Sequence, residues 1–436
     1  MSRRDAGNRG KLAPKRPMNR QRILAGADVV LPDRVVSGAS LVIEDGIIVD
    51  IVARALSAVS GADRVDAGGC TIVPGFIDVH VHGIGGIDTQ DGPDAIRAMA
   101  ARLPGHGVTA FAPTTVACPP AELRMVIGAI RMCREAPAAQ SARVLPAHLE
   151  SNFISHDYRG AQPASCLRSP ASALGEPGTG GEQAHSARHG ASAEVGAFTG
   201  ADILRVIEEA GPDVGIVTLA PELDQAMPLI ARLVAAGRIV SLGHSAASFE
   251  IALEAIRLGA RQATHLFNRM PPLGHREPGL AGAILQTPEV AAELVCDGYH
   301  VHPAMLRVAV AAKGADRVMA ITDGSAGAGL PPGSTARLGG RTIVMREQGA
   351  FLEDGTLAGS TATMDRVFRV LTGVGGLGFV DAAHLCSTTP ARELGLVGHG
   401  VIAAGAAADL VVLGPRLNVV QTYVGGEPCL SLGGTD

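Results

Sequence analysis

Apolar and polar positions alternate in a regular way through the middle of the chain. Apolar runs typical of buried strands occur in eight places, at 70–83, 108–117, 143–152, 214–222, 238–247, 262–268, 290–301 and 317–325. Between them lie segments whose apolar residues recur every three or four positions, which is typical of amphipathic helices; clear examples are 121–136, 222–237 and 249–260. Eight strands alternating with helices predict an α/β fold, a (β/α)8 TIM barrel over residues 70–385.

The two ends of the chain have a different pattern. Residues 21–69 and 386–436 contain short β-branched runs separated by Gly, Pro and Asp, which predict hairpins. We therefore expect one small β-sandwich domain built from both ends. Residues 1–20 are basic and lack an apolar core, so a disordered tail is expected. Residues 160–200 are rich in Ala, Ser and Gly and predict a mobile loop, with a lid over the barrel mouth as the alternative role.

Composition excludes several classes of partner. The chain has 436 residues, a formal net charge of −5, three Tyr and no Trp, which gives neither the basic footprint nor the stacking platform of a nucleic-acid-binding protein. No apolar run is long enough to span a membrane. The seven Cys form no CxxC pair, which indicates reduced thiols and a cytoplasmic location.

Polar side chains fall late in the predicted strands, where the carboxyl ends of barrel strands meet at one mouth. A single histidine at a strand end is usually structural, but packing does not account for six histidines and two acids. The set comprises His80, His82, His148, Glu150, His244, His265, His300 and Asp323. This set predicts a shared metal site.

The spacing of these residues suggests how ions would be held. His80 and His82 are two positions apart in PGFIDVHVHG, so their side chains leave the same face of a strand and can chelate one ion. His244 and His265 can hold a second ion, with Glu150 as a bridge. Such ligands suit a divalent metal, zinc first and then iron, manganese or cobalt, with one or two ions per subunit. Asp323 is then the expected general base, although ITDGS also fits a turn.

A second dense motif, THLFNRMPPLGHREPGLAG, follows the sixth predicted strand at 264–282. It places Asn268, His275 and Arg276 in a loop rich in Gly and Pro. Because a guanidinium fits phosphate or carboxylate, the loop favours an anionic substrate group, with an exposed Arg that binds nothing as the alternative.

Taken together, these motifs resemble the amidohydrolase superfamily and, within it, the N-acetylglucosamine-6-phosphate deacetylase family. The matching stretches run in order from about residue 70 to 415 and are PGFIDVHVHGIGG, HLE (148–150), GHS (243–245), THLFN, REPGLAG, CDGYHVHP (296–303), TDG (322–324), LAGST (357–361) and AADLVVL (407–413). The first stretch identifies only the superfamily, whereas HREPGL and DGYHVHP are more specific to the deacetylases.

The resemblance implies metal-dependent amide hydrolysis that removes acetate from an N-acetylated amino-sugar phosphate. It implies a principal metal site of Glu150, His244 and His265, a second site at His80 and His82 that only some members keep, and Asp323 as the catalytic acid–base. It also implies a homodimer in which Arg276 reaches the neighbouring subunit. The residues expected to bind substrate are Asn268, Arg269, Arg276, His300, Gln162 and, as an apolar contact, Met364.

The chain departs from the family pattern at three points. HLEGP is HLESN here, with Ser151 and Asn152; the family's Gly-Ala-His is GAQ, ending in Gln162; and Arg269 replaces a small residue. These changes fit a shifted substrate, such as N-acetylgalactosamine-6-phosphate or an N-acyl amino acid. A related amidohydrolase bridged by a carboxylated lysine is a weaker alternative, because Lys11, Lys15 and Lys313 are the only lysines. A non-catalytic barrel is the remote alternative.

Overall fold

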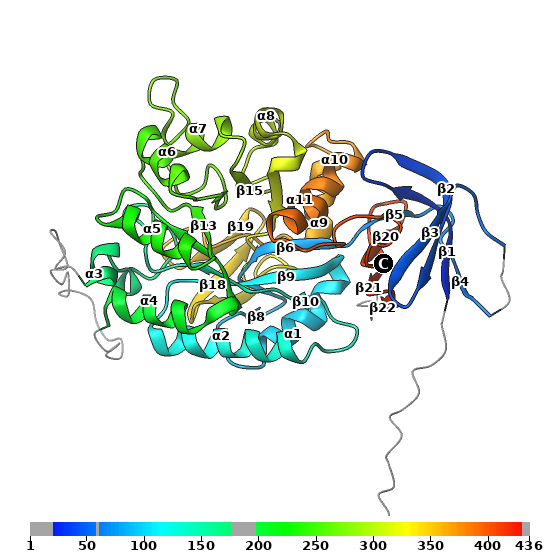
Figure 1. Cartoon of the computed structure of the whole chain (residues 1–436), viewed down its shortest axis with the longest axis horizontal. Coiled ribbons are helices and arrows are strands. Elements are labelled where there is room, and N and C mark those ends of the chain that lie inside the picture. Colours follow the sequence, from blue (N-terminus) through cyan, green and yellow to red (C-terminus); the bar gives the residue numbers. More distant parts are fainter. Residues whose placement is uncertain (1–20, 58–60, 176–197, 430–436) are drawn as a thin grey trace, which may run out of the picture.

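The computed structural model describes residues 21–57, 61–175 and 198–429. The expected tail at 1–20 lies outside the described residues, as do residues 176–197 of the expected mobile loop. The described chain forms a barrel surrounded by helices and, beside it, a second sheet made from both chain ends (Figure 1). The predicted combination of TIM barrel and terminal β-sandwich is therefore confirmed.

Eight parallel strands form the barrel in sequence order. They are β6 (Phe76–Val81), β9 (Val108–Thr115), β11 (Ala147–Glu150), β12 (Val214–Leu219), β13 (Ile239–Leu242), β14 (Gln262–Ala263), β15 (Ala291–Val295) and β16 (Val318–Ile321). The two-residue strand β10 (Arg143–Val144) extends the sheet beside β9. Each of the eight strands lies within one of the eight apolar runs, because a strand covered by helices on one side and barrel interior on the other is buried on both faces.

The barrel closes between its last strand and its first. The backbone N–H groups of Asp323 and His82 donate to the carbonyls of His80 (3.0 Å) and Gly324 (2.8 Å). The Thr322 hydroxyl donates to Asp78 Oδ2 at 2.5 Å within the same seam. This closure brings the residues after β16 against the end of β6, so Asp323 is held beside His80 and His82.

Helices cover the outside of the barrel (Figure 1). The longer helices are α1 (Ala95–Arg102), α2 (Pro120–Glu135), α4 (Gly200–Glu209), α5 (Ala226–Ala235), α6 (Phe249–Arg257), α7 (Gly279–Gln286), α8 (Pro303–Lys313) and α9 (Met364–Thr372). Shorter helices are α3 (Pro170–Leu174), α10 (Phe379–Ala383), a π-helical turn (His384–Thr388) and α11 (Thr389–Glu393). Their apolar faces join one large core with the strands, including Phe111, Leu229, Leu306 and Phe368.

The terminal sheet joins strands from both ends of the chain. Its strands are β1 (Arg22–Val30), β2 (Val35–Glu44), β3 (Ile47–Val52), β4 (Asp63–Asp66), β5 (Thr71–Pro74), β20 (Leu410–Leu413), β21 (Val419–Val424) and β22 (Glu427–Pro428). β5 pairs with β1 and β20, so the N-terminal half is joined to the C-terminal half at this strand. A separate core around Leu24, Leu41, Ile72 and Leu410 stabilises the domain.

The apolar run at 70–83 is two strands and not one, which corrects the sequence interpretation. β5 belongs to the terminal sheet and β6 to the barrel, with Gly75 between them. A Cβ atom at Gly75 would lie 2.2–2.8 Å from the Thr109 side chain, so the close approach of the chain to β9 requires glycine here. The hydrophobic pattern does not reveal this crossing, because both strands are apolar.

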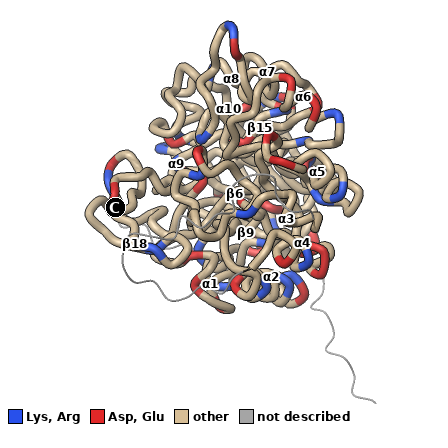
Figure 2. Tube along the Cα trace, turned by 90° about the vertical axis from the view of Figure 1, so that its left-hand side faces the viewer, with Lys and Arg blue, Asp and Glu red and all other residues tan. Residues whose placement is uncertain are grey.

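A small antiparallel sheet lies beside the mouth of the barrel. It consists of β17 (Thr335–Leu338), β18 (Arg341–Arg346) and β19 (Gly349–Leu352), and the short hairpin β7 (Gly83–Ile84) and β8 (Ile87–Asp88) lies nearby. Acidic and basic residues are interspersed over the chain trace rather than gathered in one single-sign region (Figure 2). Within the part of the chain that is described, no helix is long and apolar enough to cross a membrane.

Candidate active site

Five candidate ligands and one acid lie at the carboxyl ends of five barrel strands. His80 lies in β6 and His82 follows it; Glu150 ends β11; His244, His265 and Asp323 each follow their strand by two residues. All six side chains are buried. The structure therefore brings together residues that are up to 243 positions apart in sequence, as the barrel geometry predicts.

The first cluster forms around one oxygen of Glu150. Glu150 Oε1 lies 2.7 Å from His244 Nε2 and 2.9 Å from His265 Nε2. The two imidazole nitrogens lie 3.0 Å from each other. Ligand atoms bonded to one zinc ion at about 2.0–2.2 Å lie about 3 Å apart, so these three atoms have the separation that one coordination sphere requires.

The second cluster shares Glu150 with the first. His80 Nε2 lies 3.2 Å from His82 Nε2, and His82 Nε2 lies 3.4 Å from Glu150 Oε2. Asp323 Oδ1 lies 3.5 Å from His80 Nε2 and 3.4 Å from His82 Nε2. The spacing of two positions on one strand thus places both rings on a single centre, and Glu150 stands between the two clusters.

The hydrogen bonds behind these rings show that the donor set fits a cation. His244 Nδ1 lies 2.8 Å from the carbonyl of Tyr158, so this nitrogen carries the proton. The lone pair of His244 Nε2 then faces the lone pairs of Glu150 Oε1 and, at 3.0 Å, the ring of His265. Facing lone pairs repel unless positive charge lies between them. A divalent metal ion supplies that charge, and neutral imidazole and carboxylate are suitable ligands.

The electrostatics of the cluster point the same way. Burial alone raises the pKa of the Glu150 carboxyl, but in the metal-free protein the positive charge between these atoms comes from protons on the His244 and His265 rings, whose charge and hydrogen bonds outweigh burial and hold the pKa well below its ordinary value. Burial lowers the pKa of His82, yet hydrogen bonds to Asp323 and Glu150 raise it to about 10. The two carboxylates therefore create a strong demand for positive charge at this point.

The site also contains strained backbone. His244, His265 and Asp323 have positive φ angles of 48°, 31° and 47°. Such conformations cost about 1–3 kcal/mol each for residues other than glycine and gather at functional sites. They turn each side chain from its strand end toward the centre of the mouth.

His148 lies near the site but faces away from it. Its Nδ1 lies 2.9 Å from the Val79 carbonyl and its Nε2 lies 2.9 Å from Thr218 Oγ1. With both nitrogens engaged in a fully buried position, His148 has no lone pair free for an ion. We therefore interpret His148, which the sequence grouped with the shared metal site, as a packed and hydrogen-bonded histidine of the barrel interior.

The three departures from the family pattern have different locations. Ser151 and Asn152 are buried and bonded to backbone carbonyls: Ser151 to Thr218, and Asn152 to both Cys118 and Cys166. They stabilise the loop after β11 and do not line the pocket. Gln162 does line the pocket, and its amide donates to Glu150 Oε2.

The residues predicted to bind substrate are divided between the pocket and other places. Asn268, Arg269, His300 and Gln162 line the pocket that contains the clusters. His300 is oriented by Asp297, whose Oδ2 lies 2.6 Å from His300 Nδ1. Arg276 is exposed and is not among the lining residues. Met364 begins α9 and lines a separate small cavity with Asp78 and His106.

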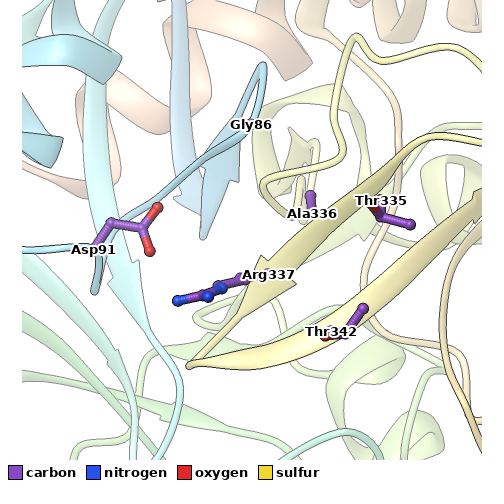
Figure 3. Close-up of a pocket in the computed structure, with 6 residues that line it drawn as sticks. All are labelled: Gly86, Asp91, Thr335, Ala336, Arg337 and Thr342. Carbon is purple, nitrogen blue, oxygen red and sulfur yellow. The ribbon is translucent and has the colours of Figure 1, made fainter.

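The sequence analysis did not single out the apolar wall of the pocket. Val116, Ala161, Leu338 and Leu357 line it, and Leu338 comes from β17. Arg337, the preceding residue of β17, lines a second, open pocket with Gly86 and Asp91, toward which its side chain extends (Figure 3). Successive strand residues face opposite sides, so one strand contributes to both pockets.

Comparisons with known proteins agree with this geometry. The amidohydrolase family profile matches residues 71–429. The N-acetylglucosamine-6-phosphate deacetylase of Lysinibacillus sphaericus is 33% identical over 370 residues, covering 84% of this chain and 87% of that protein. The N-acetylgalactosamine-6-phosphate deacetylase of Escherichia coli O157:H7 is 32% identical over 360 residues, covering 82% of this chain and 87% of that protein.

A solved structure shows the same likeness. The N-acetyl-D-glucosamine-6-phosphate deacetylase of Mycobacterium smegmatis, a variant solved in complex with N-acetyl-D-glucosamine-6-phosphate, is 32% identical and superposes with a TM-score of 0.80. The match covers 94% of this chain and 100% of that one. The chain belongs to the amidohydrolase family and, within it, to the N-acetylglucosamine-6-phosphate deacetylases.

Proposed function

We propose that the protein hydrolyses the acetamide of N-acetylglucosamine-6-phosphate to give glucosamine-6-phosphate and acetate, in a metal-dependent reaction. The observation that carries the proposal is the convergence of His244 and His265 on Glu150 Oε1 at 2.7 and 2.9 Å, beside Asp323, in one pocket at the barrel mouth. The curated relatives with this activity support the choice of reaction.

Glu150, His244 and His265 would hold the principal divalent ion, and His80 and His82 would complete a second site with Glu150. Zinc is the first choice because it accepts imidazole and carboxylate ligands in tetrahedral sites; iron, manganese and cobalt use the same ligands. A bound ion supplies Lewis acidity, which polarises the acetyl carbonyl and makes a water molecule more acidic.

Asp323 performs the proton transfers in this proposal. Its Oδ1 lies 3.4–3.5 Å from the two nitrogens of His80 and His82, at the edge of the site that faces the pocket. From there it accepts the proton of the attacking water and delivers it to the amide nitrogen, so that the amine leaves uncharged. In the metal-free protein the hydrogen bond from His82 holds the pKa of Asp323 below its ordinary value despite burial, and a bound ion would supply positive charge at the same place, which keeps the carboxylate ionised and able to accept.

The substrate would lie between the clusters and the outer wall of the pocket. Asn268, Arg269 and His300 line this region and would bind the sugar phosphate, with Gln162 near the acetyl group. Arg276 would contribute from the neighbouring subunit of a homodimer, which accounts for its exposure in a single chain. Met364 remains a predicted apolar contact. A cytoplasmic location is part of the proposal, since all seven cysteines are free thiols.

A substrate panel tests the proposal. Acetate release is measured with the 6-phosphates of N-acetylglucosamine, N-acetylgalactosamine and N-acetylmannosamine and with the unphosphorylated sugars. We expect the highest kcat/KM for N-acetylglucosamine-6-phosphate; the likeness to the N-acetylgalactosamine-6-phosphate deacetylase makes that sugar the competing candidate. Asp323→Asn should keep its metal content and lose about 10²–10⁴-fold in kcat. Hydrolysis that survives Glu150→Gln undiminished would refute the assignment.

A further inference from the structure

A fully buried carboxylate lies directly behind His80, on the side away from the pocket. Glu293 lies in the middle of β15 and has no solvent-exposed surface. Its Oε2 lies 2.9 Å from His80 Nδ1 and 3.4 Å from the backbone nitrogen of His265. Its other oxygen, Oε1, is buried and has no hydrogen-bond partner among the described residues. Neither the reaction nor the pocket uses this side chain.

Packing gives no reason to keep a carboxylate here. Burying an ionised carboxylate costs several kcal/mol unless partners compensate, and a buried oxygen without a partner adds to that cost. His148 Nδ1 is 3.7 Å from Glu293 Oε1, which is too far for a hydrogen bond, and this nitrogen already donates to the Val79 carbonyl. Among the residues that the structure describes, His80 is therefore the one side chain that Glu293 contacts at hydrogen-bond distance.

The same contacts exclude a third ion at this position. Glu293, His80 and His148 have ligand atoms close enough together for metal binding. However, both nitrogens of His148 are engaged, with Val79 and Thr218, and His80 Nδ1 is engaged with the carboxylate itself. Within the described part of the chain, Glu293 Oε1 is then the one free ligand atom on this side, which is too few to hold an ion, because His80 Nε2 points in the opposite direction, toward His82.

We propose that Glu293 is a positioning residue of the metal site: its carboxylate holds His80 with the proton on Nδ1, so that the Nε2 lone pair faces His82 and Glu150 and binds a cation there. A histidine that ligates a metal commonly donates its other N–H to a carboxylate, which fixes the ring and makes the ligating nitrogen more basic. The inference rests on the metal dependence proposed above, but not on the identity of the sugar.

The test measures metal binding and not turnover. Metal content is determined for wild type and His80→Ala after dialysis against metal-free buffer, and zinc affinity is then titrated with a competing chelator. The difference between the two proteins defines the ion that depends on His80. We expect Glu293→Leu, which has no acceptor, to lower the affinity for that ion about 10–100-fold. Glu293→Gln keeps an acceptor without the charge, and its effect should be smaller. The ion at Glu150, His244 and His265 should be retained in both variants.

Asp409→Asn is the matched control, because Asp409 is also a buried carboxylate bonded to a histidine ring, with its Oδ2 2.8 Å from His399 Nδ1, but lies outside the site. It should lower stability and leave metal affinity unchanged. Equal zinc affinity in Glu293→Leu and wild type, or no difference between His80→Ala and wild type, would overturn the proposal.

A second measurement covers the case in which the Glu293 variants do not fold. The ring ¹⁵N shifts of His80, assigned by comparison with His80→Ala, should show a proton on Nδ1 alone in metal-free wild type. A proton on Nε2 would overturn the proposal. Because neither experiment uses substrate, a failure of the deacetylase assignment would leave these results interpretable.

Discussion

The side-chain amide of Gln162 connects Glu150 with the end of β9: its Nε2 donates to Glu150 Oε2, and its Oε1 accepts a hydrogen bond of 2.7 Å from the backbone nitrogen of Ala117. Four residues earlier, the Tyr158 carbonyl accepts from His244 Nδ1. The segment 158–162 therefore touches two candidate metal ligands. Since Gln162 leaves Glu150 Oε1 for His244 and His265, it acts on the geometry of the principal cluster.

Gln162→Glu is expected to impair the enzyme more than Gln162→Leu, although Glu has nearly the shape of Gln. A carboxylate at position 162 can still accept from Ala117 but cannot donate to Glu150, and it places two acids in contact. Leucine loses both hydrogen bonds without adding charge, and the unpaired groups should lower the free energy of unfolding by about 1–3 kcal/mol. We expect kcat/KM to fall at least tenfold in Gln162→Glu, as measured by acetate release. Full activity in that variant would show that the amide donor is not required.

Arg269 and Arg276 are both candidates to bind the phosphate, but they lie in different places in the structure. Arg269 lines the pocket of its own chain, where its side chain packs on Gly160: a Cβ atom there would lie 2.5 Å from Arg269 Nε. Arg276 is exposed, outside this pocket. We expect Arg269→Ala to raise KM for the phosphorylated sugar about tenfold or more, through the loss of a charge-assisted hydrogen bond, with little change for the unphosphorylated sugar.

Arg276→Ala should have the same effect only if the protein is a dimer, so the mass of the protein in solution is measured alongside the kinetics. An unchanged preference for phosphorylated sugars in Arg269→Ala would remove Arg269 from the anion site. An unchanged preference in Arg276→Ala would do the same for Arg276.

The sequence predicted the barrel because helices and strands leave local, periodic signals. The eight apolar runs and the helices at 121–136, 222–237 and 249–260 all appear near the expected positions. Strand ends converge in any such barrel, so His80, His82, Glu150, His244, His265 and Asp323 could be grouped before their distances were known. The pairing of His80 with His82 could also be predicted, because side chains at positions i and i+2 of a strand lie on the same face.

The parts that the sequence did not predict depend on contacts between distant segments. Glu293 lies in the run AAELV, where nothing local indicates that its partner is His80, 213 residues earlier. Leu338 reaches the pocket only because the sheet β17–β19 lies beside the mouth. His148 has the same residue type and strand-end position as the candidate ligands, and only its bonds to Val79 and Thr218 distinguish it.

Removal of metal is expected to destabilise the protein as well as inactivate it. Without an ion, only a proton can supply positive charge between His244 Nε2 and Glu150 Oε1, which lie 2.7 Å apart in a buried position. An ion present at about 100–1,000 times its dissociation constant stabilises the folded state by about 3–4 kcal/mol. The melting temperature should therefore fall by several degrees after chelation and recover with added zinc. In His244→Ala this zinc-dependent shift should be smaller; identical melting curves for metal-free and metal-loaded wild type would contradict the assigned site.

Lys313 provides a test of stability at alkaline pH, away from the site. It ends α8 and is buried, and its Nζ donates to the carbonyls of Ile284 (3.0 Å) and Thr287 (2.5 Å) at the end of α7. Burial, aided by the charge of Arg317, lowers the pKa of Lys313 to about 8, and Glu289, Glu393 and Asp316 offset this in part. The unfolded chain keeps a lysine pKa of about 10.4.

Between these two values the unfolded state binds more protons than the folded state, so the free energy of unfolding should rise with pH in this window. We therefore expect the stability of wild type relative to Lys313→Met to increase from pH 8 to pH 10.5, by up to about 3 kcal/mol. Denaturation curves of both proteins at several pH values measure this difference, and the comparison cancels other groups that titrate in the same range. A difference that stays constant or falls as the pH rises would show that burial does not lower the pKa of Lys313 in the folded protein.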